Sequence, residues 1–260
     1  MIALPIVAAL SIFARGPVTP PLCTTDSITL RGRPEHVHVC GNRNGIPAIV
    51  SSGDGGWIHL APHVADVLAS QGYFVIGLDA KAYLTSFTDT SGPLTPANIA
   101  ADFAALISMA GSGRGAPILI GVSEGAALSV VAASSDTIKP RIAGVIALGL
   151  GEMNELAWHF RDSIIYLTKR VPDEPCFRSS AYIDKVSPIP LVLIQSASDE
   201  FVTRAEADRL ATLARQPKRV AVLDASDHAF SNKRPELDAT LGDSLHWIEE
   251  VARKSERTDN

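Results

Sequence analysis

The sequence predicts an α/β protein in which a mostly parallel central sheet is covered by helices on both faces. From residue 46 onwards, apolar runs of strand length alternate with segments of helical periodicity. The strand candidates are apolar on both faces, as parallel strands between two layers of helices are. The chain has 260 residues, 46% of them hydrophobic and 20% charged, which is enough for one large core. We therefore expect a single domain over residues 23–260.

The first expected element is a hairpin that precedes the alternating part. Residues 27–30 and 36–39 have strand character and flank a turn at Arg31-Gly32. A two-residue turn at these positions places Cys23 opposite Cys40, close enough for a disulfide in an oxidising compartment. Two unrelated thiols are the alternative.

The other elements follow in order along the chain. Strands are expected at 46–51, 73–78, 117–122, 141–148, 190–195 and 219–223. Helices are expected at 60–68, from Pro96 after the N-cap Thr95, at 124–133, and from about Pro235. The aromatic-rich segment 151–188 interrupts this order and is too polar for another buried strand pair. We expect it to pass over the carboxyl edge of the sheet, where such folds bind ligands. An extra strand and loop without a binding role is the alternative.

The N-terminal residues predict an export signal. Residues 1–14 carry no charged side chain and are too few to span a bilayer. They are similar to the apolar region of a secretory signal, although the usual basic residues before it are missing. We interpret 1–22 as a leader of a periplasmic or secreted protein. An ordinary buried segment of a cytoplasmic protein is the alternative.

Composition excludes several function classes. The 23 basic and 28 acidic side chains give a net charge of −5, which argues against nucleic acid as a partner. The three cysteines lack the spacing of a zinc site. The pairs His36/His38 and His59/His63 have no adjacent carboxylate or cysteine, so we interpret them as solvated faces. No metal or cofactor is expected, and the oligomeric state stays open.

A candidate nucleophile lies between an expected strand and an expected helix. Gly121-Val-Ser123-Glu-Gly125 follows the apolar strand and opens the helix, which is the context that the Gly-x-Ser-x-Gly motif requires. The sharp turn exposes the serine, and the glycines let strand and helix approach closely. Ser123 is therefore the predicted nucleophile.

A serine nucleophile needs a base, and the base needs an orienting acid. The order expected after such a serine is acid and then histidine. Asp199 and His228 each follow the end of an expected strand, so both can converge on Ser123. Glu200 and Asp227 are the rivals for the acid, and Asp199 is preferred because it comes first after its strand.

The developing oxyanion needs backbone donors. The N–H of Glu124, the residue after the nucleophile, is the first expected donor. The second is expected from the run Ser52-Gly-Asp-Gly-Gly-Trp57, with Asp54 or Gly55 as the candidates. Asp54, Trp57 and Glu124 are also assigned to substrate binding. A plain glycine-rich turn is the alternative.

Three motifs together resemble a known family. The chain resembles the α/β-hydrolase superfamily and, more narrowly, the VirJ/AcvB-type bacterial virulence proteins over residues 45–250. The resemblance rests on the Ser52–Trp57 run, on Tyr83-Leu84 followed by Thr95-Pro96 and Asp102, and on Gly121-Val-Ser-Glu-Gly-Ala126. It implies a periplasmic serine hydrolase that cleaves the aminoacyl ester of an aminoacylated phospholipid such as lysyl-phosphatidylglycerol. Members usually have Tyr before the serine and an aromatic residue after it, where this chain has Val122 and Glu124.

The charges offer a separate reason to expect a cationic substrate. The side chains of Asp54 and Glu124 would border the acyl pocket, where carboxylates disfavour an oxyanion unless a cation accompanies it. An aminoacyl ester supplies that cation, and a lipid ester would require peripheral contact with a membrane surface. In the alternative, both side chains point to solvent. A general carboxylesterase or thioesterase, and a non-catalytic binding module associated with secretion, remain the alternative functions.

Overall fold

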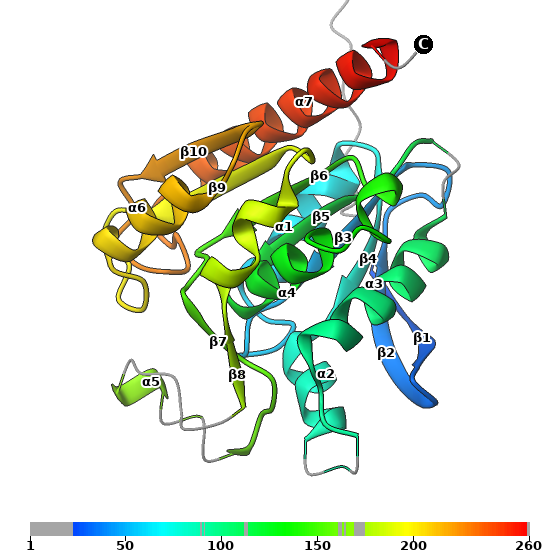
Figure 1. Cartoon of the computed structure of the whole chain (residues 1–260), viewed down its shortest axis with the longest axis vertical. Coiled ribbons are helices and arrows are strands. Elements are labelled where there is room, and N and C mark those ends of the chain that lie inside the picture. The colour runs from blue at the N-terminus through cyan, green and yellow to red at the C-terminus, as the bar shows by residue number, and fades with distance from the viewer. Residues whose placement is uncertain are drawn as a thin grey trace, which may run out of the picture.

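The central feature of the computed structural model is one eight-stranded sheet in the order β1-β2-β4-β3-β5-β6-β9-β10 (Figure 1). The structure describes residues 23–258 except 89, 91, 112–113, 161–162, 164 and 169–174, so the expected leader lies outside the described residues. In this sheet β4, β3, β5, β6, β9 and β10 run parallel to one another, whereas β2 is antiparallel to both β1 and β4. The predicted mostly parallel sheet is confirmed. The strands of this sheet are β1 (Thr24–Leu30), β2 (Arg33–Cys40), β3 (Ile46–Ser51), β4 (Tyr73–Leu78), β5 (Ile118–Val122), β6 (Gly144–Leu148), β9 (Leu191–Ser196) and β10 (Lys218–Leu223).

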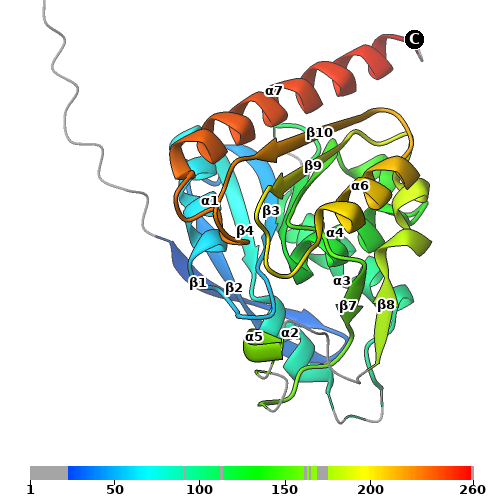
Figure 2. The same ribbon diagram turned by 90° about the vertical axis from the view of Figure 1, so that its left-hand side faces the viewer.

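Helices cover both faces of the sheet, as predicted. Figure 2 shows α1 and α7 on one side and α3, α4 and α6 on the other. Each side has its own buried apolar cluster, so the strands are packed on both faces. The helices are α1 (Leu60–Ser70), α2 (Ala80–Phe87), α3 (Pro96–Ala110), α4 (Glu124–Ala133), α5 (Ile165–Thr168), α6 (Arg204–Leu213) and α7 (Arg234–Thr258). No helix in the described part of the chain is long and apolar enough to cross a membrane.

The N-terminal hairpin has the expected register. Thr24 lies opposite Val39 and Leu30 opposite Arg33, on either side of the two-residue turn. Cys23 and Cys40 form a disulfide, which decides between the two alternatives for these residues. The bond ties the start of β1 to the end of β2, and Cys40 is fully buried beside the sheet.

Two helices follow directly from their sequence signals. Thr95 is the N-cap of α3, Pro96 its first residue, and Asn98 accepts the Thr95 N–H at 3.0 Å. In α7 the apolar stripe faces the sheet, and its members are at most 2% exposed: Leu237, Leu241, Leu245 and Ile248.

Several elements differ from the expectation, among them α6, for which no helix was expected. Helix α2 was not predicted because it is short and follows β4 at once, and the Asp79 carboxylate starts it by accepting the Ala82 N–H at 3.0 Å. Strand β6 begins at Gly144 rather than at residue 141 because a 3₁₀ turn occupies Lys139–Arg141.

The expectation that segment 151–188 is too polar for a strand pair was wrong. β7 (Met153–Glu155) pairs antiparallel with β8 (Cys176–Arg178). The polar side chain of Asn154 can be buried there because its amide donates to Ser179 Oγ at 2.8 Å and to the backbone oxygens of Gly151 and Glu152 at 3.2 Å.

Candidate active site

Ser123 occupies a strained turn between β5 and α4. Its φ is 53°, in the left-handed region that non-glycine residues rarely adopt. The Ser123 N–H donates to Leu148 O at 2.8 Å, which anchors the turn to β6. Every residue of α4 is buried, so this helix is packed on all sides and its position relative to the sheet is fixed. The turn presents the hydroxyl at the carboxyl edge of the sheet.

The two motif glycines allow the close approach that this turn needs. A Cβ on Gly121 would overlap the backbone of Gly125 and Ala126. A Cβ on Gly125 would overlap the backbone oxygens of Ser51 and Ser52 at the end of β3. Both positions therefore exclude any side chain for steric reasons.

We expect Gly125→Ala to lower the free energy of unfolding by about 2 kcal/mol or more, because the backbone must shift to admit a methyl group. Gly242→Ala is the matched control, since Gly242 lies inside α7 with nothing closer than 4.0 Å to an added Cβ. That change should stabilise the protein by up to about 1 kcal/mol. Urea unfolding of the two variants measures both, and equal effects would contradict the packing argument.

His228 and Asp199 are in direct contact. His228 Nδ1 lies 2.7 Å from Asp199 Oδ2, and the Asp199 side chain is fully buried while that of His228 is 14% exposed. The backbone N–H groups of Phe201 and Val202 donate to Asp199 Oδ1 at 2.9 and 2.8 Å. Gln195 Nε2 donates to Asp199 Oδ2 at 3.1 Å. These donors fix the position of the Asp199 carboxylate against the imidazole.

The two rival acids have other partners. Glu200 Oε2 accepts the backbone N–H of His228 at 2.8 Å, and Asp227 Oδ1 accepts that of Ser231 at 2.9 Å. Asp199 is therefore the carboxylate that contacts the imidazole. The role of Glu200 in positioning the histidine backbone was not expected from the sequence.

Ser123 and His228 line one cavity of about 950 Å³. Gly149 has a φ of 62°, and a Cβ there would lie 3.2 Å from His228 Nε2, so the chain after β6 packs directly on the imidazole. Within the described residues, Ser123 Oγ makes no hydrogen bond to His228. The arrangement leaves the serine hydroxyl open to the cavity, with the histidine in the same wall.

The Ser52–Trp57 run forms a tight turn beside the serine. Gly56 N–H donates to Gly53 O at 3.0 Å, and a Cβ on Gly53 would lie 3.2 Å from the Ser123 Cβ. The backbone N–H groups of Asp54 and Gly55 contact the Asp54 carboxylate, which lowers its pKa, but burial outweighs them and raises the pKa overall. The two expected donors thus belong to residues of the cavity wall.

Trp57 lies elsewhere than its assigned role requires. It is not among the residues that line the cavity. Its ring stacks on His38 at 4.4 Å between centroids, and a Cβ on Gly77 of β4 would overlap it. Trp57 therefore packs on the sheet, and the cavity wall is formed by its neighbours in the chain, Gly56 and Ile58.

The pairs His36/His38 and His59/His63 were interpreted as solvated faces, and only part of each pair is solvated. His36 is exposed, but His38 is half-buried under Trp57. His63 Nε2 lies 2.7 Å from Asp238 Oδ1 and so ties α1 to α7. In the described part of the chain, no group of three or more His, Cys, Asp or Glu residues is arranged to hold a metal ion.

Carboxylates dominate the charge of the cavity. Its lining includes three basic side chains, His59, Arg209 and His228, against six acidic residues: Asp54, Glu124, Glu152, Glu155, Glu200 and Glu206. Glu124 is 7% exposed, and its Oε1 accepts the Glu155 N–H at 3.1 Å. Burial, and then the neighbouring charge of Glu155, raise the pKa of Glu124 well above its ordinary value. The alternative that Glu124 points to solvent is excluded.

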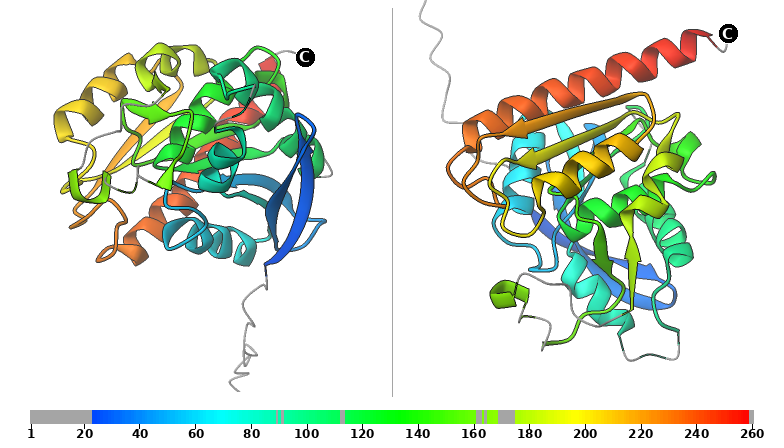
Figure 3. Two further views of the ribbon diagram at one scale, coloured as in Figure 1. Left: turned by 90° about the horizontal axis from the view of Figure 1, so that it is seen from below. Right: turned by 60° about the vertical axis from the view of Figure 1, so that its left-hand side comes forward.

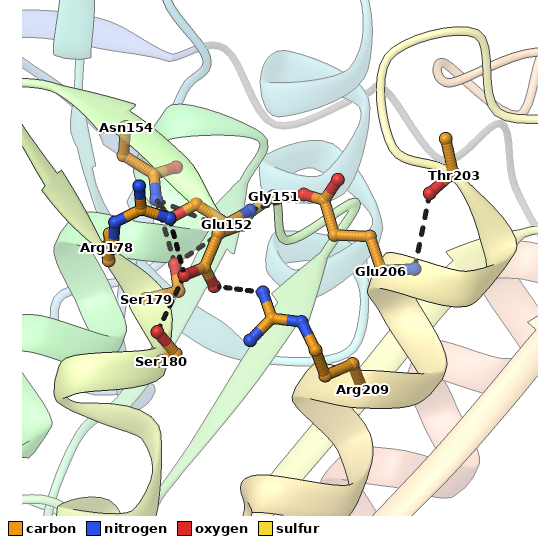
Figure 4. Close-up of polar contacts among 9 residues, drawn as sticks. All are labelled: Gly151, Glu152, Asn154, Arg178, Ser179, Ser180, Thr203, Glu206 and Arg209. Atoms are coloured by element: carbon orange, nitrogen blue, oxygen red, sulfur yellow. Dashed lines mark hydrogen bonds and ion pairs between the residues drawn. The ribbon is translucent and has the colours of Figure 1, made fainter.

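Part of segment 151–188 forms one side of the cavity, near the carboxyl edge of the sheet as expected. Figure 4 shows Glu152 contacting Arg209 Nη2 at 2.9 Å, Arg178 Nη1 at 3.5 Å and Ser180 Oγ at 2.6 Å. Burial raises the pKa of Glu152, but the hydrogen bonds from Ser180 and Arg209 outweigh it and lower the pKa overall. Glu206 Oε1 accepts the Glu152 N–H at 2.6 Å. This network joins the segment to α6. It could not be expected from the sequence, because segment 151–188 has no regular periodicity.

Known proteins share this architecture. A membrane phospholipase A, described as a bacterial virulence factor, superposes with a TM-score of 0.65 at 14% identity over 87% of both chains. A putative aryl esterase from Burkholderia cenocepacia gives 0.65 at 19% identity, over 87% of this chain and all of that one. A thioesterase domain of the curacin biosynthetic pathway gives 0.61 at 13% identity, over 84% and 99%. The fold is that of the α/β-hydrolases.

Comparisons of the sequence point to a smaller group of proteins than the fold does. Residues 46–162 match the family described as bacterial virulence protein (VirJ), which confirms the resemblance over that stretch. This stretch of the chain is thus similar to the VirJ family. An Escherichia coli (strain K12) protein, the uncharacterized protein YfhR, is 36% identical over 58 residues. That match spans 22% of this chain and only 20% of the relative.

Proposed function

We propose that the protein is a serine hydrolase that cleaves a carboxylic ester with a cationic acyl group. The observation that carries this proposal is the buried Asp199–His228 contact at 2.7 Å in the wall of the cavity that Ser123 also lines. A strained serine, a histidine and a buried carboxylate at the carboxyl edge of one sheet are the parts that acyl transfer needs.

The proposed first half of the reaction acylates Ser123. His228 Nε2 takes the hydroxyl proton as Oγ attacks the ester carbonyl, while Asp199 holds the Nδ1 proton and stabilises the imidazolium. The N–H of Glu124 and that of Asp54 or Gly55 bind the oxyanion. The intermediate collapses, and the alcohol leaves with the proton from His228.

The second half releases the acid. Water attacks the acyl-enzyme carbonyl while His228 takes one of its protons. The bond to Ser123 Oγ then breaks, and His228 returns the proton to the serine. Ser123, His228 and Asp199 thus end in their starting states, and the steps use only groups of this chain.

The charges of the cavity support a cationic acyl group. Asp54 and Glu124 lie beside the nucleophile turn, and their raised pKa values reflect carboxylates held in a poorly solvated wall. An ammonium group next to the reacting carbonyl would favour the ionised form of these carboxyl groups and pair with it, so that no unbalanced negative charge faces the oxyanion. Aminoacyl esters carry such a group, and the VirJ match supports an aminoacylated phospholipid such as lysyl-phosphatidylglycerol.

A general carboxylesterase or thioesterase is the second candidate. It is favoured by the apolar part of the cavity wall, which includes Ile58, Leu60, Val122, Met153 and Phe201. An uncharged acyl chain would pack against these side chains without needing the carboxylates.

We further propose that the protein works in the periplasm or another oxidising compartment. The Cys23–Cys40 disulfide supports this location, because such bonds persist where thiols are not kept reduced. A phospholipid substrate would bring the protein into peripheral contact with a membrane surface.

A panel of esters of one alcohol, phosphatidylglycerol, tests the function. We expect kcat/KM for the lysyl ester to exceed that for a neutral N-acetyl-alanyl ester at least tenfold, about 1.4 kcal/mol of transition-state binding. An anionic succinyl ester should be slower still. Equal rates for all three would contradict the cationic acyl group and favour a general esterase, and no hydrolysis of any ester would contradict the hydrolase.

A further inference from the structure

The edge strand β10 carries an unusual apolar surface. Among the described strands it pairs with β9 alone and so ends the sheet, as Figure 3 shows. Half of the exposed large hydrophobic side chains in the described part of the chain gather at this edge: Leu213 of α6 at 41%, Val220 at 48% and Val222 at 36%. Edge strands are normally protected by a central charge, a proline or a bulge. β10 has basic residues only at its start, Lys218 and Arg219, and its centre carries two exposed valines.

The backbone of β10 shows which groups face outward. Pro217 O accepts the Leu191 N–H at 3.1 Å, and Leu223 O accepts the Ala197 N–H at 2.8 Å, so odd-numbered residues point to the β9 side. Backbone groups alternate along a strand. The N–H and C=O groups of Lys218, Val220 and Val222 therefore point away from the sheet, without a strand partner among the described residues; the Lys218 N–H donates to the side chain of Gln216 at 2.9 Å, which must give way when a strand pairs there.

We propose that β10 pairs antiparallel with β10 of a second copy of this chain, with Ala221 opposite itself. In this register the outward-pointing residues face one another in hydrogen-bonded pairs. Val220 lies opposite Val222 twice, and Lys218 lies opposite Asp224 at both ends. The apolar centre and the opposite charges at the ends are thus self-complementary, as an isologous interface requires.

The neighbouring register is less favourable. If Val220 lay opposite itself, Lys218 would face Val222, and both pairs of Lys218 with Asp224 would be lost. The proposed register is therefore the one that uses both the valines and the charges.

The side chains of β10 divide between two flanking helices. Lys218 Nζ donates to Ala214 O at the end of α6, at 2.6 Å, which places the even-numbered side chains on the α6 face. On the opposite face Arg219 lies 4.8 Å from the ring of Trp247 in α7. A stable interface needs about 1,200–2,000 Å² in total. In the proposed dimer, Leu213 at the end of α6 adds to the area buried by the strand pair.

Cross-linking tests the register directly. In a Cys176→Ser background, which removes the free thiol, Ala221→Cys should give a disulfide-linked dimer under mild oxidation. Residues in a non-hydrogen-bonded antiparallel pair have Cα atoms about 4.5 Å apart, within disulfide reach. Arg219→Cys is the matched control, because the two copies of residue 219 would be offset by roughly 13 Å along the strand.

Ultracentrifugation tests the interface itself. We expect the wild-type protein to be a dimer, and Val220→Lys and Asp224→Lys each to raise the dissociation constant at least tenfold. A wild-type chain that stays monomeric across the concentration range would overturn the proposal, as would cross-linking at residue 219 but not at 221. β10 lies outside the Ser123 cavity lining, so the monomeric variants should keep their ester hydrolysis. The assembly test also stands if that activity is absent.

Discussion

Replacing Ser123 with alanine is expected to abolish covalent labelling by a fluorophosphonate probe. It should also lower kcat for ester hydrolysis by roughly four to six orders of magnitude, the loss typical of a missing nucleophile. The physical reason is that Ser123 and His228 line the same cavity. Asp199 orients the imidazole of His228, with 2.7 Å between Asp199 Oδ2 and His228 Nδ1. No other hydroxyl is held in a strained strand-to-helix turn within the described residues.

Ser180→Ala is the matched control for this experiment. Its hydroxyl lies near the same cavity but donates to Glu152 Oε1 at 2.6 Å, so it is not free to act as a nucleophile. We expect this variant to label like the wild type. Labelling that persists in Ser123→Ala, or that is lost in Ser180→Ala, would refute the assignment of the nucleophile.

Much of this fold could be predicted because local signals and tertiary packing agree. The strand before Gly121 is apolar on both faces, and the helix after Ser123 begins with small residues. Both features are needed because the strand and the helix pack closely against each other at this turn. The hairpin register follows from one two-residue turn, which brings Cys23 to Cys40. Such features depend on neighbours along the chain or on a fixed register.

The composition of the cavity was harder to predict because it depends on side-chain direction. Asp199 and Glu200 are adjacent in sequence, yet one contacts the His228 imidazole and the other its backbone. Trp57 follows the glycine-rich turn but points to β4, since Gly77 leaves room for its ring there. Glu155 lies in a segment without periodicity, so its place beside Glu124 had no sequence signal.

Glu124→Gln is expected to stabilise the protein at neutral and alkaline pH while weakening its selection of cationic esters. The pKa of Glu124 is raised well above its ordinary value of 4.5, mainly by burial, so the folded chain holds this proton more tightly than the unfolded chain does. Near pH 4 both states are protonated, and wild type and variant should be equally stable. As the pH rises, the unfolded chain ionises freely, and the wild type loses stability relative to the variant.

The glutamine removes this charge and can keep the hydrogen bond from the Glu155 N–H, because its Oε1 remains an acceptor. We expect the free energy of unfolding at pH 8 to rise by about 1–3 kcal/mol, the usual cost of an uncompensated buried polar group. kcat/KM for lysyl esters should fall about 10- to 100-fold, as for the loss of a hydrogen bond to a charged group. Neutral esters should be unaffected.

Glu250→Gln separates this effect from a general change in charge. Glu250 lies on α7, pairs with His246 at 3.1 Å, and is not among the residues that line the cavity. Urea unfolding between pH 4 and pH 8 and the ester panel should leave that variant unchanged. A Glu124→Gln protein that is less stable at pH 8, or that loses lysyl and neutral esters equally, would show that the carboxylate serves packing alone. The predicted combination of higher stability with lower charge selectivity is the result that a buried carboxylate kept for substrate recognition should give.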